Sequence, residues 1–175
     1  MRLVMTGALL LASASVLAQT PYAGMQTRPI KALSEQQVSD LTAGRGMGLA
    51  LAAELNGYPG PSHVLELADK LDLSAEQRDR IKALFESMKA EALPLGSKLI
   101  AQETELDRLF ASRAITPDSL KASTAAIAAT QGALRETHLK YHLSTADILS
   151  TGQMQKYAEL RGYAGDGGRQ MHHHH

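Results

Sequence analysis

Residues 73–113 read LSAEQRDRIKALFESMKAEALPLGSKLIAQETELDRLFASR. Apolar residues recur in this stretch every three or four positions, which is the period of an amphipathic helix. They are Ile81, Leu84, Phe85, Met88, Ala92, Leu95, Leu99, Leu106, Leu109 and Phe110. The pattern predicts one long helix from Ala75 to about Arg113. We expect it to bend near Pro94 and Gly96, because proline lacks the backbone donor and clashes with the preceding turn.

A second long helix is predicted directly after the first. Thr116 supplies a capping residue and Pro117 stands at the first helical position, where its fixed backbone angle suits a helix. Apolar residues at seven-residue intervals then extend the pattern to about Leu149. They are Leu120, Ile127, Leu134, Tyr141 and Ile148. Because the link 114–115 is so short, the two helices are expected to form an antiparallel hairpin.

Shorter helices are predicted on either side of this hairpin. Their ranges are 34–55 with an interruption at 44–48, about 63–71, and 152 to about 161. Ser62 is the expected N-cap of the second of these helices. The glycines of 44–48 could form a phosphate-binding loop, but such a loop requires a preceding strand and none is predicted here. They indicate a hinge or a close helix–helix approach instead. The predicted fold class is all-α: a bent antiparallel hairpin of long helices with short flanking helices.

The pattern Leu-Ser-x-x-Gln occurs three times, at 33–37, 73–77 and 149–153. Serine at an N-cap accepts a hydrogen bond from the backbone N–H three residues on. Glutamine at that position reaches back to the amide of the serine, which completes a capping box. Each copy therefore predicts the start of a helix.

The ends of the chain differ in composition from its centre. Arg2, the apolar run 3–16 and the small-residue site Val16-Leu17-Ala18 are typical of a secretory signal peptide. We expect residues 1–18 to be removed, 19–33 to form a flexible leader and 164–175, rich in Gly and His, to be disordered. A single helical domain then spans 34–163. No later stretch holds 18 consecutive apolar residues, so no membrane insertion is expected after cleavage.

The composition of the chain makes several classes of function improbable. The 18 Lys and Arg balance the 18 Asp and Glu, which disfavours nucleic acid or an anionic membrane as the main partner. The absence of cysteine excludes disulfides and thiolate metal sites. Neither Gly-x-Ser-x-Gly nor His-Glu-x-x-His occurs, so we expect a protein that is not an enzyme.

The motif copies at 73–77 and 149–153 flank the predicted hairpin in a secreted chain without cysteine. Together these features resemble the Spy/CpxP-like family, whose motif is Leu-Thr/Ser-x-x-Gln. In this chain the helix-cap positions that match it are Leu73, Ser74, Gln77, Leu149, Ser150 and Gln153. The similarity covers about 62–163, whereas the copy at 33–37 is additional and 20–60 has no clear counterpart.

The resemblance implies a periplasmic location and one of two roles. One branch of the family comprises ATP-independent chaperones and stress-response modulators that hold unfolded clients. The other comprises metal-resistance and metal-sensor proteins of the CnrX type, which bind divalent metals through His and carboxylate side chains on the hairpin. The motif caps helices and does not distinguish the two branches.

Candidate ligands come from individual residues. His138 and His142, at i and i+4, lie on one helix face. This arrangement suits either a metal site or a structural role, in which His138 packs and hydrogen-bonds while His142 is solvated. The resemblance favours metal, because relatives carry a ligand pair in this part of the hairpin. His63 and Glu66, at i and i+3, can face one ion together, and the resemblance adds Glu86 on the facing helix. Such ligands accept zinc, copper, nickel or cobalt.

Two features complicate this ligand set. The sensors carry a second His pair on the first helix, but Leu67 stands four residues after His63. The terminal run 172–175 is either a native metal-binding tail or a purification tag. Methionines such as Met47, Met88 and Met154 are expected to fill the core.

The sequence therefore predicts a periplasmic metal-binding protein of the resistance or sensing type. The alternative is a periplasmic chaperone, although the family's cradle chaperones tend to be basic and this chain is neutral. An open hairpin leaves one face uncovered, and a second copy of the chain could cover that face in a homodimer. Unfolded clients and a membrane-bound signalling protein are the other candidate partners.

Overall fold

A computed structural model describes residues 22–163, and their regular structure is entirely helical. The predicted signal peptide and C-terminal tail lie outside the described residues. In chain order the elements are η1 (Met25–Thr27), α1 (Glu35–Thr42), α2 (Leu51–Glu54), α3 (Pro61–Glu66), α4 (Ala75–Ala111), α5 (Pro117–Ala146) and α6 (Thr151–Leu160). No helix of the described residues is long and apolar enough to cross a membrane.

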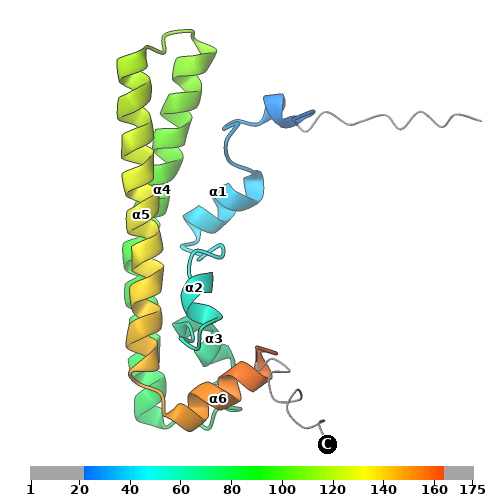
Figure 1. Cartoon of the computed structure of the whole chain (residues 1–175), viewed down its shortest axis with the longest axis vertical. Helices are drawn as coiled ribbons and strands as arrows, with labels where there is room; N and C mark the ends of the chain where they lie inside the picture. The colour runs from blue at the N-terminus through cyan, green and yellow to red at the C-terminus, as the bar shows by residue number, and fades with distance from the viewer. Residues whose placement is uncertain (1–21, 164–175) are drawn as a thin grey trace, which may run out of the picture.

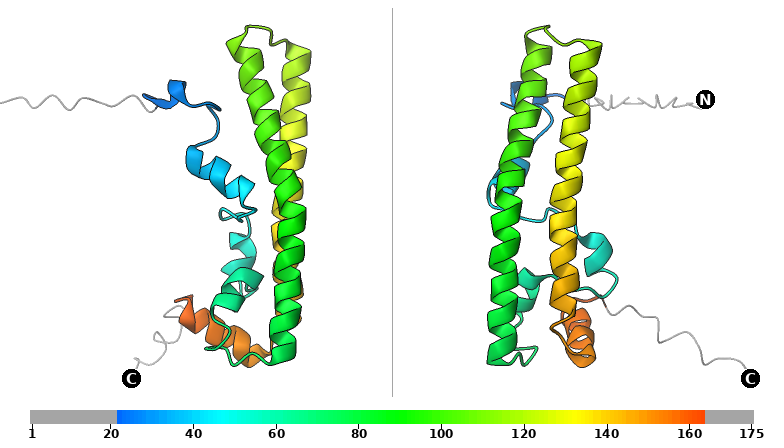
Figure 2. Two further views of the ribbon diagram at one scale, coloured as in Figure 1. Left: turned by 180° about the vertical axis from the view of Figure 1, so that it is seen from behind. Right: turned by 90° about the vertical axis from the view of Figure 1, so that its left-hand side faces the viewer.

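The predicted hairpin is confirmed: α4 and α5 run antiparallel and pack along their length (Figure 1). α1, α2, α3 and α6 follow one another along one side of it, as the two further views also show (Figure 2). α4 continues through Pro94. The glycine that permits a close approach of α1 is Gly96, where a Cβ would lie 2.4 Å from the carbonyl oxygen of Leu41.

All three predicted capping boxes are present. Ser34, Ser74 and Ser150 each accept a hydrogen bond from the backbone N–H of the glutamine three residues on, and each glutamine side chain accepts from the serine amide. These bonds satisfy backbone donors that the first turn of a helix leaves free.

Two predicted helices have different bounds in the structure. The expected helix 49–55 shortens to the single turn of α2, which follows Met47 and Gly48 in the left-handed backbone region. α3 is capped by Gly60 instead of Ser62, with Pro61 at its first position, and it ends at Glu66. The prediction placed this start two residues too late because it took a serine cap over the stronger signal of Pro61.

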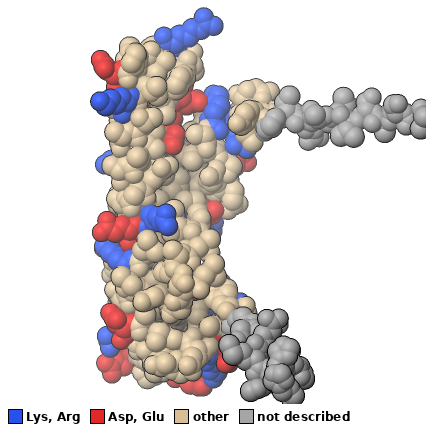
Figure 3. Space-filling model, viewed as in Figure 1, with Lys and Arg blue, Asp and Glu red and all other residues tan. Residues whose placement is uncertain are grey.

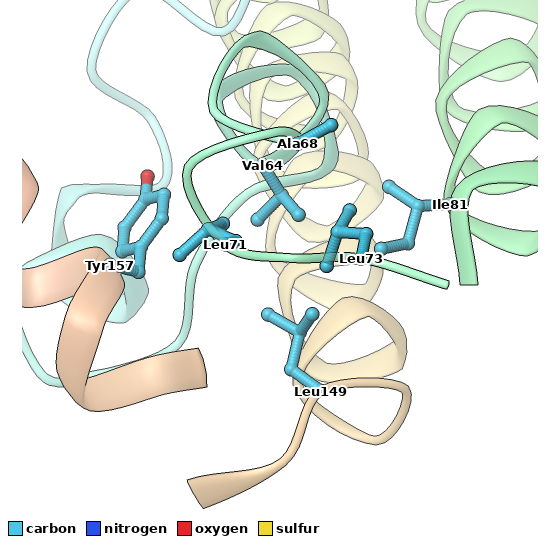
Figure 4. Close-up of a cluster of buried hydrophobic side chains, with 7 residues drawn as sticks. All are labelled: Val64, Ala68, Leu71, Leu73, Ile81, Leu149 and Tyr157. Atoms are coloured by element: carbon cyan, nitrogen blue, oxygen red, sulfur yellow. The ribbon is translucent and has the colours of Figure 1, made fainter. Parts of the chain in front are cut away.

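Two hydrophobic clusters hold the short elements to the hairpin. The base cluster lies where α4 begins and α5 ends, and Figure 4 shows its buried side chains converging from α3, α4, α6 and the connecting turns. Its members are Val64, Ala68, Leu71, Leu73, Ile81, Leu149 and Tyr157. The middle cluster joins α1 to the hairpin through Leu41, Ala92, Leu99, Ile127 and Leu134.

The described part of the predicted leader contacts the hairpin. Ile30 is buried, and Lys31 forms a 3.0 Å salt bridge with Asp107 of α4. In the view of Figure 3, charges of both signs follow the outer edge of the hairpin, whereas the lower surface toward the short helices is largely uncharged. The space between the two clusters contains the candidate site.

Candidate functional site

A cavity of about 640 Å³ lies between the short elements and the hairpin. The glycine-rich loop 43–48, α2 and α3 form one side of it. α4 contributes Phe85, Met88 and Lys89, and α5 contributes His138 and His142. Segments that are far apart in the sequence therefore meet around one hollow.

The carboxylate of Glu54 lies in the wall of this cavity and is only 6% exposed. The backbone N–H of Gly60 donates to its Oε2 at 3.1 Å, and the Tyr157 hydroxyl donates to its Oε1. Arg161 Nε lies 3.8 Å from Oε1. A buried carboxylate requires such donors, because its loss of hydration is otherwise uncompensated. Glu54 thus connects α2 to the end of α6.

Tyr157 is held as a hydrogen-bond donor. Its burial, and then its hydrogen bond to Glu54, raise the pKa of the phenol far above its usual value. The hydroxyl therefore keeps its proton at all ordinary pH values and fixes one oxygen of the carboxylate in place.

Two histidines flank the same carboxylate. His63 Nδ1 lies 3.4 Å from Oε1, and His142 Nδ1 lies 3.6 Å from Oε2. Both separations exceed those of good hydrogen bonds, so neither imidazole is bonded tightly to the carboxylate. The histidines come from α3 and α5 respectively.

The imidazole of His142 is oriented by the backbone. Its Nδ1 lies 2.7 Å from the carbonyl oxygen of Tyr58, and because a carbonyl only accepts, Nδ1 donates this bond. The lone pair of a neutral ring is then on Nε2. A Cβ at Gly60 would lie 2.7 Å from this atom, so the ring occupies its position only because residue 60 is glycine.

His138 is the more buried of the two α5 histidines, at 3% exposure. Its Nε2 is buried without a hydrogen-bond partner. Burial, and secondarily the nearby His142, lower the pKa of His138, so the ring is neutral near pH 7. A Cβ at Gly46 would lie 3.4 Å from Nδ1 of His138, which places the glycine-rich loop against the ring.

The structure brings four of the five predicted ligands to the cavity. His63, Glu66, His138 and His142 all line it, although Glu66 is exposed. Glu86 is exposed on α4 and is not among the lining residues. Within residues 22–163, no three His, Asp or Glu side chains are positioned as a ready metal-binding group.

Glu54 is the central residue of the site, and sequence reasoning missed it. It appeared only as one acidic residue in a predicted helix, a setting in which most carboxylates are solvated. The signal that could have found it is its position between two glycine-containing turns, in a segment without other charges. Arg161 was likewise not singled out.

Comparison with protein-family models, with curated proteins and with solved structures finds no match for this chain. The functional argument therefore depends on the cavity and its side chains.

Proposed function

We propose that the cavity binds one divalent transition-metal ion through Glu54, His63 and His142. One observation carries this proposal: two imidazoles from different helices flank one buried carboxylate at 3.4 and 3.6 Å. Imidazole and carboxylate groups are the usual nitrogen and oxygen ligands of such ions in proteins. His142 would bind the ion through Nε2, because its Nδ1 donates to the carbonyl oxygen of Tyr58.

The surroundings of the three residues favour this use. Metal ligands are commonly oriented by hydrogen bonds from neighbouring groups. Here Tyr157 and the amide of Gly60 bond the carboxylate, and the carbonyl of Tyr58 bonds His142. Each ligand keeps a free donor site. Glu66 and His138, which line the same cavity, are available as further ligands.

The role we propose is metal resistance or sensing in the periplasm, without catalysis. It rests on the cavity and on the resemblance of the capped hairpin to the Spy/CpxP-like family, which includes the CnrX-type branch. Zinc, copper, nickel and cobalt all accept this donor set, because ligand chemistry alone does not select among them. Glu86 is left out of the site, since it does not line the cavity.

Substitution of the ligands tests the proposal. We define the tail-substituted protein as the chain in which His172, His173, His174 and His175 are each replaced by Gln. In this background, His63→Gln and His142→Gln should each weaken Zn²⁺ binding at least tenfold, measured by competition with a chromophoric chelator. Glu86→Gln is the matched control and should leave the affinity unchanged. Equal affinities in all three variants would refute the site.

Exposed apolar residues beside the cavity favour client binding as a second candidate function. Leu51, Leu55 and Tyr58 are 53%, 57% and 44% exposed. Exposed apolar side chains that are grouped together commonly bind other proteins. Light scattering from reduced α-lactalbumin tests this alternative: a chaperone should suppress its aggregation, and Leu51→Ser with Leu55→Ser should remove that effect. Unchanged suppression in the double variant would contradict the alternative.

A further inference from the structure

A second group of possible ligand side chains lines the cavity, separate from the Glu54 cluster (Glu54, His63 and His142). Met47 and Met88 line it together with His138. The sequence alone indicated that these methionines fill the core, because no Met-x-x-Met cluster occurs. Met88 is buried, as expected, whereas Met47 is 39% exposed.

Met88 is buried at 7% exposure but belongs to neither the base cluster nor the middle cluster. It lies on α4, in the part of the helix that borders the cavity. A methionine that lines a cavity offers a polarisable thioether, which can bind a soft metal ion as well as fill space.

Met47 has a strained backbone. Its φ of 45° lies in the left-handed region, which costs a residue with a side chain roughly 1–2 kcal/mol. Such strain persists where the surrounding structure imposes it, commonly at functional sites. The preceding residue, Gly46, lies against the His138 ring on its Nδ1 side.

His138 supplies an unused donor atom. Its Nε2 is buried without a partner, and leaving a buried polar atom unpaired costs roughly 1–3 kcal/mol. Coordination of an ion by the imidazole would offset this cost. The desolvated, neutral ring suits an ion of low charge, because the penalty for bringing an ion out of water rises with its charge.

We infer that Met47, Met88 and His138 form a site for a soft monovalent metal ion, Cu⁺ or its analogue Ag⁺. Thioether ligands select Cu⁺ over the harder divalent ions, and imidazole binds copper well. The three side chains carry no charge, whereas the Glu54 cluster offers the carboxylate that divalent ions prefer. The inference uses the same cavity as the proposed function but none of its three ligands, so either can hold without the other.

Methyl NMR provides the direct test, with Ag⁺ as a redox-stable probe. In the tail-substituted protein labelled with [¹³C-methyl]methionine, one equivalent of Ag⁺ should shift the Met47 and Met88 resonances. Met154, which packs against the base cluster, is the internal control and should stay in place. The absence of a shift at Met47 and Met88 would overturn the inference.

A competition titration of Cu⁺ against bicinchoninate gives a second readout. The double variant Met47→Leu/Met88→Leu should weaken Cu⁺ binding at least tenfold and leave Zn²⁺ binding unchanged. His63→Gln should have the opposite effect. Far-ultraviolet circular dichroism checks that the variants fold. If the folded double variant binds Cu⁺ as tightly as the unmutated protein does, the soft site is refuted. If the unmutated protein does not bind Zn²⁺, only the proposed function is refuted.

Discussion

Gln77 and Gln153, which are 76 residues apart, exchange two amide hydrogen bonds of 3.0 Å each. Both glutamines also complete the capping boxes that begin α4 and α6. Gln77 donates in addition to the carbonyl oxygen of Ile148 at 3.0 Å, and Gln153 to that of Leu71 at 3.3 Å. The repeated motif therefore joins two helix starts to each other as well as capping each of them.

This pairing predicts that the motif glutamines are energetically coupled. Gln77→Ala and Gln153→Ala should each lower the free energy of unfolding by about 1–2 kcal/mol, because each leaves partly buried partners unbonded. The double variant should cost less than the sum, with a coupling of roughly 0.5–1 kcal/mol. Urea denaturation measures all three values.

The third copy of the motif provides the control for this cycle. Gln37 completes the same capping box at α1 but has only local hydrogen bonds. Gln37→Ala should cost only about 0.5 kcal/mol. If the effects at Gln77 and Gln153 are additive and the loss at Gln37 is as large as theirs, the motif acts only as a helix cap.

Tyr157→Phe tests the support of the buried carboxylate. The variant keeps the ring in the base cluster but removes a donor to Glu54. We expect a loss of about 1–3 kcal/mol in the free energy of unfolding, the cost of an under-satisfied buried group. Tyr22→Phe, at an exposed tyrosine, should change stability by less than about 0.5 kcal/mol. Similar values for both variants would contradict the role assigned to Tyr157.

A methyl group at residue 60 should disturb the site. In Gly60→Ala, the new Cβ would lie 2.7 Å from His142 Nε2, so the imidazole has to move. We expect a lower melting temperature and weaker Zn²⁺ binding. Gly132→Ala, where a Cβ meets nothing within 4 Å in α5, should instead stabilise the helix by about 0.5–1 kcal/mol. A Gly60→Ala variant with unchanged Zn²⁺ affinity would show that His142 does not need its observed position.

Burial of His138 predicts a pH dependence of stability. The folded state lowers the pKa of His138 below its usual 6.5, so the unfolded chain binds the proton more readily. The stabilisation is complete above about pH 6.5 and is lost as the pH falls toward the lower, folded-state pKa. Relative to His138→Gln, the wild type should therefore lose stability between pH 7.5 and 5.5. Urea denaturation at both pH values tests this, and a constant difference would argue that His138 titrates normally.

Much of the fold could be predicted from sequence because it depends on local rules. The period of apolar residues defined α4 and α5, and the three serine–glutamine pairs marked helix starts that the structure confirms. Pairing between Gln77 and Gln153 could not be predicted in this way. It depends on where the ends of the hairpin place two distant helix starts, which no local pattern encodes.

The candidate site was only partly accessible to sequence reasoning for the same reason. Helical spacing places His138 and His142 on one face, and both are buried in the structure. The burial of Glu54 depends on Tyr157, which follows 103 residues later. The family resemblance suggested Glu86 on the facing helix as a ligand, but it occupies an exposed position there.

Isothermal titration of Zn²⁺ into the tail-substituted protein tests the central claim most directly. If Glu54, His63 and His142 bind an ion together, one equivalent should bind with micromolar or tighter affinity. Binding should also release protons as the pH is lowered toward the range where the imidazoles titrate, because metal ligands bind in their deprotonated forms. The absence of heat that saturates at one equivalent would contradict the account of the cavity as a metal site.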